Sequence, residues 1–404
     1  MKKGMILLLL LPVWSLSLFG GGYQVRLQGQ KQTGIGLIGT PFAWDASSMF
    51  YNPGGLALYE GKFSFSAGVS PIFANQVFQM SGTNYQARTD NPVSTPFYFY
   101  GAGKIMDYLA VGIAVYTPYG STAQWEDKWA GRYLVQDISL QAIFIQPTVA
   151  FQYKDKFGIG AGFVYAMGNF ELNKYLPYNE NSTVNLQGKG NSIGFNAGVF
   201  VRPVEDLTIG LSFRSKIVME VDDGDATFVV PGSLSTTIPE ENTFSAELPL
   251  PANLEFGLAY RFSEKFLLAA EINWVQWSAY DSLNFTFENN GEMLNSQNPR
   301  KYENRVIPRL GAEYRLNDKF AFRAGIYYDQ TPTNEDYFSP ETISLNTIAF
   351  TLGMSLNPIK GLSIDLSYLQ LNGMEADKTY LPAEFSGKYK SVACIPGIGL
   401  TYQF

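Results

Sequence analysis

Ionisable side chains recur at alternate positions of stretches that are otherwise apolar. In residues 253–262, Glu255 and Arg261 share one parity with small residues, and large apolar side chains take the other. Successive side chains of a strand point to opposite faces, so these charges lie together on one face. By the same rule that face carries Arg202, Arg214, Lys216, Glu255, Arg261, Glu271, Arg309, Glu313, Arg323 and Asp365.

Charges of both signs on one face can pair with each other, whereas an ion-selective pore tends to line its constriction with a single sign. We therefore expect a blocked lumen. Arg26, Lys31 and Asp45, near the N-terminus, are candidate partners for the charges of the wall. We interpret the set as structural ion pairs in preference to a catalytic constellation.

Histidine is absent and the one cysteine is Cys394. This excludes Ser-His-Asp and Cys-His catalysis, His-rich metal sites, c-type haem and an intramolecular disulfide. A Ser-Lys dyad stays open, although no motif points to one. We expect no catalytic residue, no metal and no cofactor. The net charge of −7, without a basic stripe, argues against a nucleic-acid partner.

The strands that must position these charges are short and numerous. Aromatic residues make up 15% of the 404 residues, while charged residues make up only 16%, below the usual share of about a quarter in soluble domains. From residue 62 onward, six short polar connectors alternate with seven long loops, which requires fourteen strands. The fold predicted for 62–404 is all-β: a transmembrane antiparallel β-barrel with apolar side chains facing lipid.

The last stretch carries the clearest membrane signal. Ile398, Leu400, Tyr402 and Phe404 share one parity, and the chain ends on Phe404. A terminal aromatic after alternating apolar residues resembles the C-terminal signal of outer-membrane barrels, so the barrel-assembly machinery is an expected partner. Cys394 has the same parity, and we expect it to face lipid.

The N-terminus has the features of a secretory signal peptide. A basic start, an apolar core and small residues follow one another within residues 1–20. Beyond that core no stretch of about 18 apolar residues occurs, which excludes a helical membrane protein. We expect the mature chain in the bacterial outer membrane, as a monomer surrounded by outer-membrane lipid.

The sequence of residues 21–61 does not predict strands of the barrel wall. Glycines interrupt any long helix or strand there, yet the segment holds many large apolar side chains that need an enclosure. We predict a compact plug, or hatch, inside the barrel. The alternative is a loose leader that precedes the fold.

Several motifs, in order along the chain, resemble the FadL-type outer-membrane transporters of long-chain fatty acids and other hydrophobic compounds. They are GYQ at 22–24, NPG at 52–54, TPYG at 117–120, WAGRY at 129–133, LPLP at 248–251, RLGAEY at 309–314, RAG at 323–325 and YDQTP at 328–332. The resemblance covers nearly the whole mature chain. It implies a fourteen-strand barrel with a hatch, in agreement with the connector count.

The resemblance also implies passive uptake of a hydrophobic small molecule by capture at extracellular loops, binding inside the barrel and lateral exit into the membrane. It assigns Tyr23, Asn52, Pro53 and Gly54 to the hatch and its gate. Gly112 and Pro118 mark the third strand, where the wall would open. The basic residues nearest to the family's carboxylate-binding positions are Lys174, Arg300 and Lys301.

One loop feature and three rival functions stay open. Trp125 and Trp129, four residues apart, would present one aromatic face for ligand capture if that loop is helical, or would form an interfacial belt or pack on another loop. The rivals to transport are a sealed structural or adhesive barrel, a general porin and a barrel lipase. We expect a protein that is not an enzyme.

Overall fold

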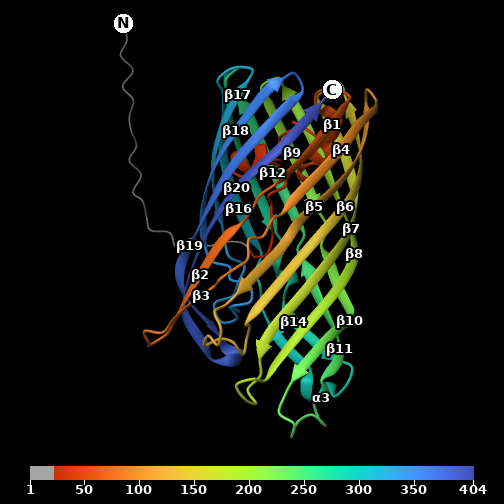
Figure 1. Cartoon of the computed structure of the whole chain (residues 1–404). Helices are drawn as coiled ribbons and strands as arrows, with labels where there is room; N and C mark the ends of the chain where they lie inside the picture. Colours follow the sequence, from red (N-terminus) through yellow and green to blue (C-terminus); the bar gives the residue numbers. More distant parts are fainter. Residues whose placement is uncertain (1–21) are drawn as a thin grey trace.

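A computed structural model describes residues 22–404, and the predicted signal peptide therefore lies outside the described residues. The wall is one antiparallel sheet of fourteen strands that closes where the last strand pairs with the first, as predicted (Figure 1). Its strands are β1 (Phe63–Val69), β4 (Phe97–Met106), β5 (Leu109–Gln124), β6 (Asp137–Tyr153), β7 (Phe157–Tyr175), β8 (Thr183–Val204), β9 (Leu207–Arg214), β12 (Asn253–Arg261), β13 (Phe266–Val275), β16 (Arg305–Arg315), β17 (Phe320–Asp329), β18 (Thr347–Ile359), β19 (Leu362–Tyr380) and β20 (Phe385–Gln403).

The short connectors all lie at one end of the barrel, together with the C-terminus, at the top of Figure 1. In outer-membrane barrels that end is periplasmic and the long loops are extracellular. Much of the sequence expected to form long loops instead extends the wall. Residues 221–248, for example, mostly form a hairpin. The added elements are β2 (Phe73–Met80), β3 (Gln86–Arg88), β10 (Ile217–Val229), β11 (Glu241–Leu250), β14 (Ser282–Phe287), β15 (Ser296–Pro299), η2 (Trp277–Ala279), α3 (Gly291–Leu294) and η3 (Leu381–Ala383).

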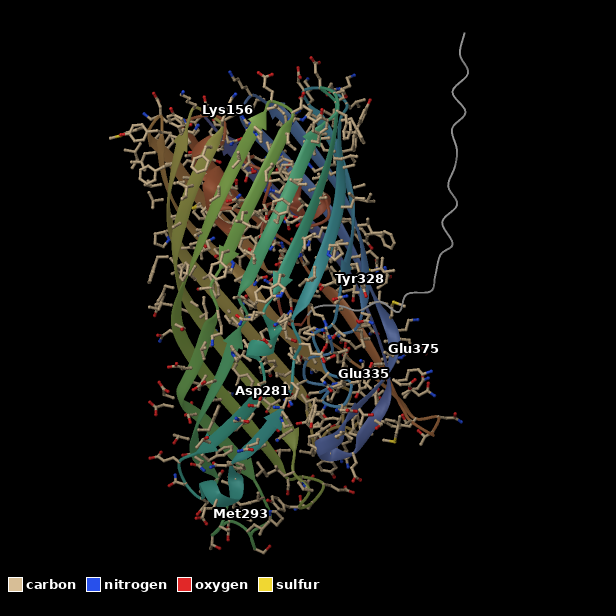
Figure 2. All side chains as sticks on the ribbon, turned by 180° about the vertical axis from the view of Figure 1, so that it is seen from behind. Lys156, Asp281, Met293, Tyr328, Glu335 and Glu375 are labelled. Carbon is tan, nitrogen blue, oxygen red and sulfur yellow. The ribbon has the colours of Figure 1, made fainter. Side chains whose placement is uncertain are left out.

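Alternation along each strand decides what faces the membrane. On β7, exposed and buried residues alternate for thirteen positions, so that Phe163 is 51% exposed while Val164 is fully buried. Figure 2 shows side chains projecting outward all around the wall. Within residues 22–404, no helix is both long and apolar enough to span a bilayer.

The last strand, β20, closes the barrel by pairing with β1, and the apolar residues near its C-terminal end face outward as predicted. Phe404 points outward and packs beside Phe63, and its carbonyl accepts hydrogen bonds from the backbone of Lys62 and Phe63. Cys394 has the outward parity predicted for it. It is half-buried, and its Sγ donates a hydrogen bond to Gln370 Oε1 at 3.2 Å.

Residues 22–59, called the hatch below, lie inside the barrel toward its periplasmic end (Figure 1). Three short helices organise them: α1 (Gln30–Gly34), α2 (Ser48–Tyr51) and η1 (Pro53–Leu58). Ile35, Ile38 and Met49 are fully buried. The wall thus provides the enclosure that the apolar side chains of this glycine-rich segment require.

Glycines of the wall let the hatch backbone come close. A Cβ added to Gly158 would lie 2.0 Å from the carbonyl oxygen of Gly54, and one added to Gly325 would lie 2.3 Å from the nitrogen of Gly36. No real side chain fits at such distances. Gly36 itself has a φ of +86°, which glycine adopts without strain. The fit between hatch and wall is therefore made by backbone at these positions.

Replacing one of these glycines should loosen the hatch. We expect Gly325→Ala to lower the free energy of unfolding by about 1–3 kcal/mol, the usual cost of overpacking, and to raise ion conductance in planar bilayers as the hatch shifts. Gly101→Ala is the control, because its Cβ would meet Phe65 at an ordinary 3.4 Å. Unchanged stability and conductance in Gly325→Ala would show that this close approach does not seat the hatch.

Candidate functional site

A buried cluster of charges joins the hatch to the wall. Arg26 of the hatch forms a bidentate ion pair with Glu255 on β12, and its Nη2 also contacts Glu271 on β13 at 3.1 Å. Arg309 on β16 donates to the same Glu271 at 2.6 Å. Glu271 also accepts the backbone N–H groups of Gly39 and Thr40. These contacts satisfy charges that burial would otherwise make costly.

The other predicted charges divide into paired and displaced ones. Lys31 of the hatch contacts Asp45 at 3.1 Å and Asp365 of the wall at 3.8 Å, so Asp45 pairs within the hatch. The inward position expected for Lys216 is wrong. The wall strand is interrupted between β9 and β10, which shifts the parity and leaves Lys216 exposed. Arg202 and Arg261 lie near the periplasmic turns and are only half-buried.

An apolar pocket lies on the extracellular side of the hatch. It is lined largely by hydrophobic side chains of β6, β7, β10, β11 and β14. Its lining includes Tyr23, Tyr119, Leu140, Phe170, Met219, Leu248, Leu283 and Phe285. Its volume is about 50 Å³. That is smaller than the roughly 150 Å³ of a cavity that admits benzene. A ligand must therefore move side chains in order to enter.

A second and larger cavity of about 620 Å³, called the wall cavity below, lies beside the pocket. Its lining mixes polar and apolar residues and includes Gln24, Val25, the connector 92–96 that precedes β4, and Ser121 and Thr122 of β5. This volume is within the range of ligand sites in proteins. The cavity thus extends from the hatch to the barrel wall at β5.

Two tyrosines stand at the boundary of the pocket. Tyr23 and Tyr119 have ring centroids 6.2 Å apart, and both are almost fully buried. Their hydroxyls donate to the carbonyls of Pro249 and Pro251. The hatch places Tyr23 by pairing with β5: the N–H of Val25 donates to the carbonyl of Pro118 at 2.8 Å, and the N–H of Gly120 donates to the carbonyl of Tyr23 at 3.0 Å.

This pairing falls where the wall is irregular. The ladder between β4 and β5 ends at Tyr98 and Tyr116, and the register between β5 and β6 shifts between Tyr116 and Tyr119. Thr117 Oγ1 bonds to the backbone of Phe97, in place of a ladder contact. Among residues 22–404, no strand pairs with Ser121 or Thr122 on the β4 side. Pro118 therefore lies at a bulge beside an unpaired stretch of β5.

Gly112 has a different environment from Pro118. It pairs regularly with Ala102 on β4 and Thr148 on β6. A Cβ at this position would lie 2.6 Å from Met49 Sδ. Gly112 thus makes room for the hatch, and the irregularity of β5 begins five residues later.

The turn at 52–54 fastens the hatch to the wall at β7 and β8. Asn52 Nδ2 donates to the carbonyls of Thr40 and Val199, and Asn52 Oδ1 accepts the N–H of Gly54. Pro53 begins η1, where its missing N–H costs nothing. Gly54 lies against Gly158 and Gly198. These three residues hold the body of the hatch and do not touch the apolar pocket.

The three basic candidates lie in different surroundings. Arg300 is 1% exposed and forms an ion pair with Glu341, and its Nη1 also donates to Tyr380 Oη at 3.2 Å. Lys174 is half-buried near the extracellular end of β7, and the charged groups acting on it are Glu341 and Arg300. Lys301 points to solvent and pairs with Asp281 at 2.9 Å. The structure thus pairs Arg300 with Glu341 and Lys301 with Asp281, and within residues 22–404 it shows no ion pair for Lys174.

Glu341 links this charged group to the apolar pocket, since it lines the pocket together with Thr342 and Tyr280. Burial by itself lowers the pKa of Arg300, but the Glu341 carboxylate and the neighbouring tyrosines Tyr280, Tyr380 and Tyr302 together outweigh burial and raise the pKa above its ordinary value. Burial raises the pKa of Tyr302, whose hydroxyl bonds to Thr342, to about 12. Arg300 is therefore cationic and Tyr302 neutral at physiological pH.

Trp125 and Trp129 do not form an exposed capture surface. The segment is not helical, and both rings are buried, stacked 4.0 Å apart at 11°. They pack on Phe78 of β2, and Trp129 also meets Phe385 of β20. Packing between loops, one of the alternatives considered above, describes their environment.

Sequence reasoning missed Glu341, and it missed the position of Tyr119 at the boundary of the pocket. Tyr119 lies in the TPYG motif, which was its available signal. Glu341 lies in a loop about forty residues from Arg300, and nothing in the spacing joins them. Within the described residues, no group of three Asp, Glu or Cys side chains is arranged to hold a metal ion.

A closed fourteen-strand wall, apolar outside and filled by a hatch at one end, defines an outer-membrane β-barrel. The chain belongs to the family described as outer membrane protein transport protein (OMPP1/FadL/TodX), whose model matches residues 13–404. The protein is accordingly one of the outer membrane, in a family of transport proteins.

Individual relatives are distant. Outer membrane protein P1 of Haemophilus influenzae is 25% identical over 369 residues, which cover 80% of this chain and 78% of that protein. The long-chain fatty acid transport protein of Escherichia coli K12 is 21% identical over 419 residues, which cover 93% of this chain and 92% of that protein.

Two solved structures share the fold. A FadL homologue from Pseudomonas aeruginosa superposes with a TM-score of 0.78 at 20% identity, covering 96% of this chain and all of that one. The Pseudomonas putida toluene transporter TodX superposes with a TM-score of 0.74 at 14% identity, covering 92% of this chain and 97% of that one.

The cluster around Arg26 predicts a large mutational effect. Arg26→Met leaves the buried Glu255 without its cation, and we expect the free energy of unfolding to fall by about 3–5 kcal/mol, measured by urea titration in detergent micelles. Lys301→Met removes a pair whose side chains are 49% and 63% exposed, and should cost at most about 1 kcal/mol. Equal losses in the two variants would mean that the Arg26 cluster does not anchor the hatch.

Proposed function

We propose that this protein carries hydrophobic small molecules passively across the outer membrane, by capture at the extracellular loops, binding in the apolar pocket and lateral exit through the wall at β5. The observation that supports this most strongly is the order in which the sites lie along the barrel. The apolar pocket, the Tyr23–Tyr119 boundary, the wall cavity and the unpaired stretch of β5 follow one another, and of the hatch only residues 22–25 lie between the pocket and the wall cavity.

The physics of this route requires no energy source. A buried methylene gains about 0.8 kcal/mol over water, so an apolar ligand favours the pocket over the aqueous phase and favours lipid at least as much. The unpaired stretch of β5 lies just beyond the outward apolar residues Ile113 and Val115 of the same strand. A ligand leaving there enters the membrane without exposure to the periplasm.

Passage requires a gate, and we assign that part to Tyr23. Its ring lines the small pocket, and its backbone closes onto β5 beside the wall cavity. Release of residues 22–25 from β5 would enlarge the pocket and join it to the wall cavity. The body of the hatch would stay in place, held by Asn52, the wall glycines and the Arg26 cluster.

The ligand's head group is a separate question. Long-chain fatty acids and aromatic hydrocarbons are the compounds that the names of similar proteins indicate. Lys174 and Arg300 are the candidates for a carboxylate, since the charge of Glu341, which lines the pocket, acts on both, whereas Lys301 faces solvent.

Uptake by cells tests the proposal. Cells expressing the protein should take up labelled toluene or labelled oleate faster than cells without it. Ala246→Trp should reduce uptake to the background rate, because Ala246 lines the pocket and the larger ring fills it.

Ser245→Trp is the matched control, since Ser245 is the adjacent residue on β11 with the opposite parity. Its uptake should equal that of the unmodified protein. Entry of small hydrophilic solutes alone would favour a general porin, and no uptake of any compound would favour a sealed structural barrel.

A further inference from the structure

An internal ion pair lies beside the apolar pocket. Glu341 lines the pocket and is 7% exposed, and its carboxylate contacts the guanidinium of Arg300, which is 1% exposed. The two residues come from different loops, the one after β15 and the one between β17 and β18. The protein therefore supplies its own carboxylate to a buried cation beside an apolar site.

Arg300 makes two further contacts through Nη1, while its Nε is buried without a hydrogen-bond partner among residues 22–404. Nη1 bonds to Tyr380 Oη at 3.2 Å and contacts the carbonyl of Pro299 at 3.4 Å, and the guanidinium lies over the ring of Tyr380. A ligand carboxylate that bonds to Arg300 Nη2 would need the position that Glu341 already takes. It would also stand beside that negative charge in a poorly solvated site, where like charges repel strongly.

Lys174 does not line the pocket. Glu341 is the first of the charged groups acting on it, but in the described part of the chain no ion pair joins the two side chains. Glu247 also borders the pocket, but its parity on β11 is opposite to that of the apolar lining and its side chain is exposed. Glu341 is thus the charged side chain on which selection at the pocket depends.

We propose that Glu341 is a specificity-determining residue: by occupying Arg300 it makes the pocket selective for uncharged hydrophobic molecules and excludes ionised acids. This inference rests on the proposed transport function and narrows its substrate class. It assigns to Arg300 a structural partner instead of a ligand, and it predicts that a single isosteric change removes the preference for uncharged molecules.

The test compares two probes with the same chain and different heads, radiolabelled 1-dodecanol and dodecanoate. Equilibrium binding to the purified protein is measured at about pH 8, where the acid is ionised. The unmodified protein should bind dodecanol at least about tenfold more tightly. Glu341→Gln should tighten dodecanoate binding by about tenfold or more and change dodecanol binding little, because the dodecanoate carboxylate no longer competes with Glu341 for Arg300.

Two further variants make the result specific. Glu303→Gln removes an exposed carboxylate that pairs with Arg305, and should change neither affinity. Arg300→Gln combined with Glu341→Gln removes both charges, and should bind dodecanol without the gain for dodecanoate. The mobility of unheated protein in electrophoresis verifies that each barrel is folded.

Equal affinity of the unmodified protein for the two probes would overturn the inference, even if Glu341→Gln fails to fold. Dodecanol binding without any gain for dodecanoate in folded Glu341→Gln would also overturn it, while transport stands. Binding of neither probe by the unmodified protein would overturn both the inference and the proposed function.

Discussion

The close approach of two backbones, that of the hatch and that of the wall, is the constraint on which the rest of the structure depends. At Gly158 and Gly325 the two come nearer than any Cβ allows. Apolar side chains of the hatch then fill the lumen, and Arg26 lies within reach of Glu255 and Glu271. Buried charges tolerate little displacement, so the close packing and the ion pairs stabilise one another.

A fixed hatch determines where a ligand can go. Passage straight through the barrel would break the Arg26 cluster and the packing at the wall glycines. The N-terminal residues 22–25 are held instead by a short pairing with β5, by contacts of their side chains and by the bond of Gly22 to Ser344. They lie between the apolar pocket and the wall cavity, and neither the close approach to the wall glycines nor the Arg26 ion pairs involves them. The proposed sideways route rests on this difference in attachment.

Much of this architecture could be read from the sequence because a membrane wall obeys a period of two and a strict alternation of short and long connectors. The strand count, the outward position of Cys394 and the pairing of Arg26 with the wall all rest on those rules. The rules fail where a strand is interrupted, as at Lys216, and in loops. Trp125 and Trp129 are buried by distant strands, and Arg300 meets Glu341 from another loop, so no local pattern could reveal either arrangement.

The most direct test of the account locks residues 22–25 to β5. Gln24 and Tyr119 face each other across the short pairing without sharing a hydrogen bond, the geometry in which Cα atoms lie about 4.5 Å apart and a disulfide fits. Gln24→Cys with Tyr119→Cys, in a Cys394→Ala background, should take up labelled toluene or oleate only after reduction. Equal uptake by the oxidised and reduced protein would contradict the account, because it would show that ligands pass while the gate stays closed.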